Sequence, residues 1–219
     1  MSRKSVGRIL AVAVLVAAPA IALAQRNINF ELLGAARSGS EASVLALLDQ
    51  GANPDSRNRL GDTPLNVAAR NGNQAMVKLL LQRSADVNLA NLARVTPLMS
   101  AAFSGHAEIV RLLLEHKADL HAIDRVQKTA MVYAAGSGHT ECVRALLDAG
   151  IGVNARDAND ATALMWAAAY GKDDTVGLLL ERGADPAARD NRGKSALTIA
   201  VEEGHAQSAD RLRAAGAKE

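Results

Sequence analysis

Apolar and polar positions recur along this chain at a fixed spacing of 33 residues. Each copy opens with a hydroxyl residue, continues with proline or alanine, and then places leucine or methionine. The five copies are Thr63-Pro64-Leu65, Thr96-Pro97-Leu98, Thr129-Ala130-Met131, Thr162-Ala163-Leu164 and Ser195-Ala196-Leu197. A period of this size indicates units that each form one supersecondary element and bury their apolar face only by stacking.

The unit at 60–92 predicts a short first helix. Thr63 is placed to cap it through its hydroxyl, and Pro64 suits the first turn, where a missing N–H costs nothing. Ala68 and Ala69 keep one side of this helix small, so a second helix can approach closely. Gly72 ends it, because glycine adopts the left-handed conformation without strain.

A second helix follows in the same unit. Met76, Val77 and the run Leu79-Leu80-Leu81 form an apolar stripe that must pack on the neighbouring units. The polar stretch at 86–94 then predicts a hairpin-like loop that leads into the next Thr-Pro. Each unit is therefore expected to consist of a helix, a turn, a second helix and a loop.

The full pattern, G-x-T-P-L-x-x-A-A-x-x-G-H-x-x-x-V-x-L-L-L-x-x-G-A-D, resembles the ankyrin repeat over nearly all of the chain after residue 24. This resemblance implies an all-α repeat solenoid with short β-hairpin fingers, built from about six units, with fingers and first helices lining a concave side. The end units depart from the pattern: Phe30-Glu31-Leu32 replaces the first Thr-Pro-Leu, and Arg211-Leu212-Arg213 replaces the last leucine run. Because no neighbour covers the end of a solenoid, it needs a polar outer face, which we expect Arg211 and Arg213 to supply. The expected units are 27–59 (N-terminal cap), 60–92, 93–125, 126–158, 159–191 and 192–219 (C-terminal cap).

Two units depart from the glycine that follows the second helix. The position is Gly51, Gly150, Gly183 or Gly216 elsewhere, but Ser84 and Lys117 in these units. We expect both residues to adopt the left-handed conformation, at a cost of about 1 kcal/mol each.

Residues 1–24 have the layout of a secretory signal peptide. Arg3, Lys4 and Arg8 precede an uncharged apolar run at 9–24, and no acid occurs in the segment. The run has 16 residues, fewer than the roughly 20 needed to span a bilayer, which favours cleavage over the alternative of an uncleaved anchor. The predicted cleavage site is Ala22-Leu23-Ala24, followed by Gln25.

Cleavage changes the charge balance. The whole chain has 25 basic and 23 acidic residues, and loss of the leader leaves 22 basic against 23 acidic. A chain so close to neutral offers no polybasic stripe, and an aromatic content of 2% offers no stacking platforms. Nucleic-acid binding is therefore not expected. The leader predicts a periplasmic protein with no membrane attachment after cleavage, which we expect to be a monomer. Its single cysteine allows no intramolecular disulfide.

No pattern of catalytic or metal-binding residues stands out. His106, His139 and His205 each follow a helix-ending glycine, where the resemblance implies a structural role. Cys142 occupies an apolar-stripe position, as Met76 does in its unit, and is expected to be a buried hydrophobe. We therefore expect no enzyme activity, no cofactor and no metal, with an unrecognised active site as the alternative.

The resemblance places partner contacts at the variable positions of fingers and first helices. Several of these positions carry apolar residues flanked by arginine, as protein-binding surfaces often do. The predicted contacts are Arg59, Leu60, Asp62, Arg70, Leu92, Val95, Phe103, Arg125, Val126, Lys128, Asn159, Tyr170 and Arg192, centred on Phe103 and Val126. The alternative is that some of them pack neighbouring fingers together, and for Tyr133 and Trp166 we favour a structural role. The expected partner is a protein of the same compartment or, if the chain is a secreted effector, a host protein.

Overall fold

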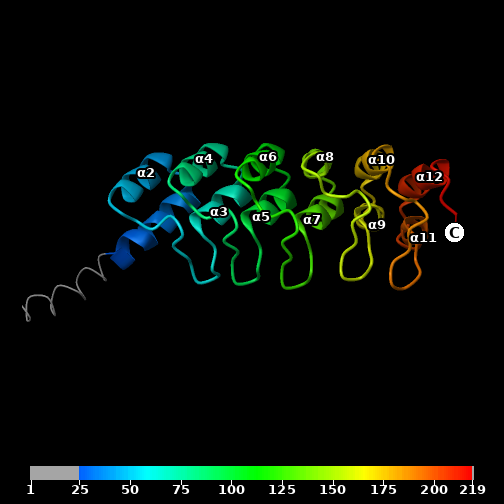
Figure 1. Cartoon of the computed structure of the whole chain (residues 1–219), viewed down its shortest axis with the longest axis horizontal. Helices are drawn as coiled ribbons and strands as arrows, with labels where there is room; N and C mark the ends of the chain where they lie inside the picture. The colour runs from blue at the N-terminus through cyan, green and yellow to red at the C-terminus, as the bar shows by residue number, and fades with distance from the viewer. Residues whose placement is uncertain (1–24, 219) are drawn as a thin grey trace, which may run out of the picture.

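The computed structural model describes residues 25–218, which form a stack of helix pairs. Figure 1 shows two rows of helices, with loops projecting from one side of the stack. The row beside the loops, here called the inner row, consists of residues 25–38, α3 (Pro64–Asn71), α5 (Pro97–Ser104), α7 (Ala130–Ser137), α9 (Ala163–Ala169) and α11 (Ala196–Glu202). The outer row consists of α2 (Glu41–Asp49), α4 (Gln74–Gln82), α6 (Ala107–Glu115), α8 (Thr140–Asp148), α10 (Asp173–Glu181) and α12 (Ala206–Ala214). The predicted all-α repeat solenoid is confirmed. The predicted leader at 1–24 lies outside the described residues.

A hydroxyl side chain caps each inner helix from α3 onward, as the sequence predicted. Each cap accepts a hydrogen bond from the backbone N–H three residues later, which satisfies one of the free donors at the helix start. The caps are Thr63, Thr96, Thr129, Thr162 and Ser195. Loss of such a cap costs about 1 kcal/mol.

The core is a continuous layer between the two rows. On α4, Met76, Val77 and Leu80 are fully buried, and the same stripe recurs on the other outer helices. The inner row contributes small residues such as Ala68 and Ala101, both buried, which lets neighbouring inner helices pack closely. Because every unit buries its stripe against its neighbours, stability depends on the stack rather than on any one unit.

Three histidines tie neighbouring units together. Each places its Nε2 within hydrogen-bond distance of a backbone carbonyl oxygen in the inner helix of the preceding unit. The pairs are His106 with Arg70 at 3.1 Å, His139 with Phe103 at 2.9 Å and His205 with Ala169 at 3.1 Å. The structural role expected for these histidines is confirmed, and the acceptor lies in the neighbouring unit.

Both expected left-handed residues are present. Ser84 has a φ of 61° and Lys117 a φ of 66°, at the position where Gly183 has 83°. A side chain in this region is strained, because its Cβ crowds the following carbonyl oxygen.

Five loops, here called the first to fifth fingers, connect each outer helix to the next inner helix. They span 50–63, 83–96, 116–129, 149–162 and 182–195. Hairpin-like shape is present, but strand pairing in the described chain is limited to isolated bridges between Arg156 and Thr162 and between Arg189 and Ser195. Side-chain bonds within each tip replace the longer ladder that a β-hairpin would have.

Candidate functional site

One residue at a fixed position organises every finger tip. In the fifth finger, Asp190 Oδ1 accepts from the backbone N–H groups of Arg192 and Lys194, at 2.9 Å each. Asp190 N donates to the Lys194 carbonyl oxygen at 3.0 Å. Asn58, Asn91, Asp124 and Asp157 make the equivalent bonds in the other fingers. These bonds fix the backbone of each tip, so the residues between them are free to vary.

Neighbouring finger tips are joined by backbone hydrogen bonds, with one interruption. Leu92 N donates to the Leu60 carbonyl oxygen, Arg125 N to Ala93, and Asn191 N to Asn159, each at 3.0 Å. In the described chain no such bond joins the tips of the third and fourth fingers, and their ribbons stand apart in Figure 1.

Four of the five aromatic residues of the chain lie on the inner row around this interruption. Phe103 and Tyr133 meet edge to face, with ring centroids 5.6 Å apart and an interplanar angle of 83°. Trp166 and Tyr170 are stacked, with centroids 6.2 Å apart and an angle of 12°. Aromatic pairs in these geometries stabilise each other beyond the area that they bury.

Lys128 joins the two aromatic pairs. Its Nζ lies 4.8 Å from the ring centroid of Trp166 and 5.7 Å from that of Tyr133. A cation over the face of an aromatic ring is attracted by the ring's negative face. The surface that runs from Phe103 through Lys128 to Tyr170 is therefore continuous, and we call it the aromatic surface.

Finger carboxylates hold two of these rings. The Tyr133 hydroxyl donates to Asp124 Oδ2, and Trp166 Nε1 donates to Asp157 Oδ2 at 2.8 Å. Burial, together with the Asp124 carboxylate, raises the pKa of Tyr133 above its ordinary value. Because the rings are fixed by hydrogen bonds, little side-chain freedom remains to be lost when a partner binds.

The predicted apolar contacts are open to solvent. Leu60 is 67% exposed, Val126 66%, Phe103 57%, Leu92 55% and Tyr170 52%. More than half of each side chain is thus left uncovered by the neighbouring fingers. The polar contacts Arg59, Arg70, Arg125, Asn159 and Arg192 are also exposed, whereas Val95 and Lys128 are half-buried.

Asp62 differs from the expectation that it contacts a partner. It is buried, and its Oδ1 accepts from Arg70 Nη2 at 3.0 Å and from Asn91 Nδ2 at 2.8 Å. Burial alone raises the pKa of Asp62, but hydrogen bonds from Asn91, Arg70 and Asn58, with the Arg70 charge, outweigh it and lower that pKa. Asp62 therefore positions Arg70 and presents no surface of its own.

Tyr133 and Trp166 have a larger place in this surface than the sequence suggested. Both are half-buried, and each is held by the carboxylate that organises its own finger tip. The signal was present in the chain, since each ring follows its aspartate by nine residues. The structural role favoured for them and a share in the exposed surface are compatible.

Among residues 25–218 no group of three or more histidine, cysteine, aspartate or glutamate side chains is placed to hold a metal ion. Within the same range no helix has the length and apolar character needed to cross a membrane. Cys142 is fully buried, as expected, and burial raises the pKa of its thiol to about 11.

Comparison with known proteins gives one family. A family model described as ankyrin repeats (3 copies) matches residues 32–124 and 123–190. A comparison with curated proteins found no match to this chain. Ankyrin repeats are protein–protein interaction modules and are in general not enzymes.

Proposed function

This chain belongs to the ankyrin repeat family, and on that premise we propose that it is a non-enzymatic binding protein of the periplasm. The aromatic surface, with Leu92 and Val126 beside it, is the contact for a protein partner. The observation that supports this proposal most directly is the exposure of Phe103, Val126 and Tyr170 near the third and fourth fingers, whose tips no backbone hydrogen bond joins in the described chain.

The chemistry of this surface supports a protein partner. Aromatic side chains and arginines carry much of the binding energy at protein interfaces. A contiguous exposed apolar patch marks an interaction site, whereas single exposed hydrophobic residues are ordinary. Here Lys128 lies between the rings of Tyr133 and Trp166, which pair with Phe103 and Tyr170, and Arg125 is exposed on the same finger tip as Lys128. A partner that buries this surface removes apolar area from water and meets positive charge at the rim.

The location is proposed from the basic and apolar layout of residues 1–24, with cleavage after Ala24. Intact mass of the protein recovered from osmotic-shock fluid tests it, and a chain starting at Gln25 is the expected result. Recovery from the culture medium instead would favour a secreted effector. Recovery of the uncleaved chain with the membranes would contradict the proposal.

Affinity capture tests the binding surface. The protein, expressed from the full chain with a C-terminal tag, is used to capture partners from a periplasmic extract. The matched control carries Leu92→Asp, Phe103→Asp and Val126→Asp, three changes at exposed side chains. We expect a partner that the parent retains and the control loses, while circular dichroism shows both to be equally helical. Equal capture by both proteins would place the contact elsewhere.

A further inference from the structure

A groove of about 1080 Å³ opens in the first unit, between residues 25–38 and the first finger. Its apolar wall is formed by Phe30, Leu33 and Leu60, and Phe30 is 78% exposed. The groove lies in the first unit, whereas the aromatic surface lies on α5, α7 and α9. Arg59 and Leu60 are the only residues that it shares with the predicted contacts.

One inner-helix residue in the wall of the groove, Gly34, lacks a side chain. Gly34 occupies the position of Val67, Ser100, Tyr133, Trp166 and Ile199 in the later units. A Cβ built at Gly34 would meet no atom within 4 Å, and the residue has no positive φ. Glycine is therefore not required by the backbone at this position, and its effect is to leave space.

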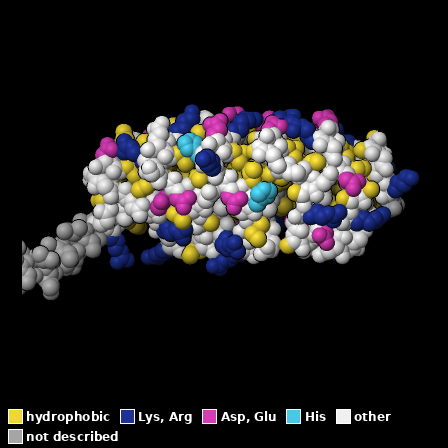
Figure 2. All heavy atoms as spheres, in the orientation of Figure 1, with side chains coloured by type: hydrophobic (Ala, Val, Ile, Leu, Met, Phe, Trp, Pro, Cys, Tyr) yellow, Lys and Arg dark blue, Asp and Glu magenta, His cyan; other side chains and the backbone are white. Residues whose placement is uncertain are grey.

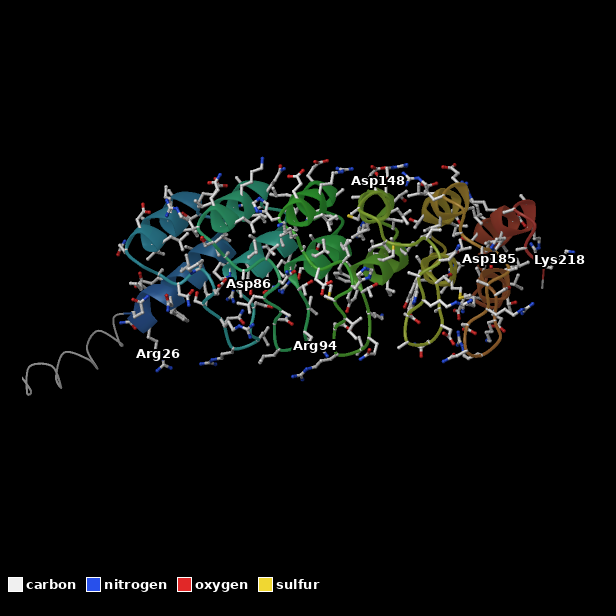
Figure 3. All side chains as sticks on the ribbon, in the orientation of Figure 1. Arg26, Asp86, Arg94, Asp148, Asp185 and Lys218 are labelled. Carbon is white, nitrogen blue, oxygen red and sulfur yellow. The ribbon has the colours of Figure 1, made fainter. Side chains whose placement is uncertain are left out.

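The lining of the groove is strongly basic. Among the described residues that line it, four are arginines and none is an acid: Arg26, Arg37, Arg57 and Arg59. No carboxylate in the described part of the chain lies within ion-pair distance of any of them. Figure 2 shows Lys and Arg side chains gathered along the finger edge at this end, and Figure 3 shows Arg26 pointing to the same edge as Arg94. Arg57 Nη2 donates to the Ala90 carbonyl oxygen at 2.7 Å, which leaves Arg26, Arg37 and Arg59 as the groups most open to a ligand. Like charges without counter-ions favour a ligand of opposite charge.

A buried hydroxyl in the groove also lacks a partner. Ser56 is 8% exposed, and its Oγ makes no hydrogen bond in the described structure. Buried polar groups are almost always hydrogen-bonded, but Ser100 Oγ, which does not line the groove, is unpaired in the same way, so the Ser56 hydroxyl does not identify a ligand. Ser56 is one of the residues that line the groove.

We propose that this groove binds an acidic peptide segment of a protein partner, with carboxylates on the arginines and an apolar side chain against Phe30 and Leu60. The charge of the lining selects carboxylates. An inorganic anion would leave the apolar wall unused, and a nucleic-acid strand would need successive aromatic faces where the groove has Phe30 alone. This site is separate from the aromatic surface and does not depend on it.

Fluorescence anisotropy tests the proposal with a fluorescein-labelled peptide that alternates glutamate and leucine. The protein is expressed from the full chain, and a peptide that alternates glutamine and leucine is the matched ligand control. We expect saturable binding of the glutamate peptide, weakened by salt, and at least about tenfold weaker binding of the glutamine peptide. Arg37→Gln and Gly34→Val should each weaken the glutamate peptide by about tenfold, the first by removing charge and the second by filling the groove. Arg94→Gln, at an exposed tip outside the groove, should leave the binding unchanged.

Three outcomes would overturn the proposal: equal binding of both peptides, equal losses in Arg37→Gln and Arg94→Gln, or full displacement of the peptide by a single-stranded oligonucleotide at equal concentration. Arg37 is exposed, so its variant remains informative if Gly34→Val fails to fold. Phe103→Asp, at a side chain of the aromatic surface that does not line the groove, should still bind the peptide. Failure of the groove and failure of the aromatic surface are therefore distinguishable.

Discussion

His139 Nε2 lies 2.9 Å from the carbonyl oxygen of Phe103, so a residue of one unit fixes the end of the inner helix that carries an exposed ring in the preceding unit. The same contact joins His106 to Arg70. Both acceptors belong to residues of the predicted binding surface. The hydrogen bond that joins two units and the side chain expected to contact a partner therefore belong to the same residue at the end of an inner helix.

Ser40, Asn73 and Lys172 replace this histidine in the other units, and the unit with Lys172, whose side chain makes no cap bond, should gain stability from a histidine. Lys172 occupies the position, and its side chain passes over Gly138. We expect Lys172→His to form the missing bond to the Gly136 carbonyl oxygen and to raise the free energy of unfolding by about 1 kcal/mol. This corresponds to a melting temperature about 2–4 °C higher, measured by circular dichroism.

The matched variant that loses the bond is His139→Leu, because glutamine would keep an amide donor near the position of Nε2. It removes the bond to Phe103 and should lower the melting temperature by a similar amount. If Lys172→His lowers the melting temperature as well, the histidine contact does not supply the stability assigned to it here.

The strained residues after the outer helices can be relieved. Ser84→Gly and Lys117→Gly place glycine at φ values of 61° and 66°. We expect each to stabilise the protein by about 1 kcal/mol, because the left-handed conformation costs glycine little, although the added freedom of the unfolded chain offsets part of the gain. The measurement is the urea midpoint. Gly183→Ser, at the same position of another unit with a φ of 83°, is the reverse control and should destabilise.

Local chemistry explains why so much of the fold could be predicted. The caps, the helix-ending glycines and the apolar stripe each depend on residues within one unit, such as Thr63, Gly72 and Leu80. The left-handed Ser84 and Lys117 followed from the same register. Because the repeat has a fixed length, the structure predicted for one unit can be applied to every other unit.

The parts that could not be predicted depend on contacts between units. Asp62 is buried by Asn91 of the next finger, and Lys128 bridges rings of two different inner helices. The groove at Gly34 is lined by residues 25–37 and by residues 56–60 of the first finger, which meet only in the folded unit. Sequence position alone gives neither the distance nor the direction of such neighbours.

Acid should destabilise the fifth finger through Asp190. Burial raises the pKa of Asp190, but the N–H groups of Lys194 and Arg192 and the Arg192 guanidinium outweigh it and hold that pKa below its ordinary value. The unfolded chain then binds more protons in acid, so this stability is present above about pH 4 and is lost as the pH falls through the lowered pKa. We expect Asp190→Asn to flatten the fall in melting temperature below about pH 4. Asparagine fits the site, since Asn58 and Asn91 make the same tip bonds. An equally steep fall in the variant would show that Asp190 does not carry this dependence.

Trp166 is the only tryptophan of the chain, so its fluorescence reports on the aromatic surface directly. Lys128 Nζ lies 4.8 Å from its ring centroid and covers part of it. We expect Lys128→Met to destabilise the protein by about 0.5–1 kcal/mol, because the cation is lost while the aliphatic stem is largely kept. Acrylamide quenching of Trp166 should change with it.

Lys78→Met is the control for this change, since Lys78 is exposed on α4 in the outer row and should alter neither quantity. Once a partner has been captured, its addition should protect Trp166 from acrylamide, because a protein seated on the aromatic surface covers the ring. Phe103→Asp should abolish this protection by placing a charge at the centre of the contact. Protection that persists in Phe103→Asp, or a partner that binds without changing the quenching, would mean that the partner is held on another face of the stack.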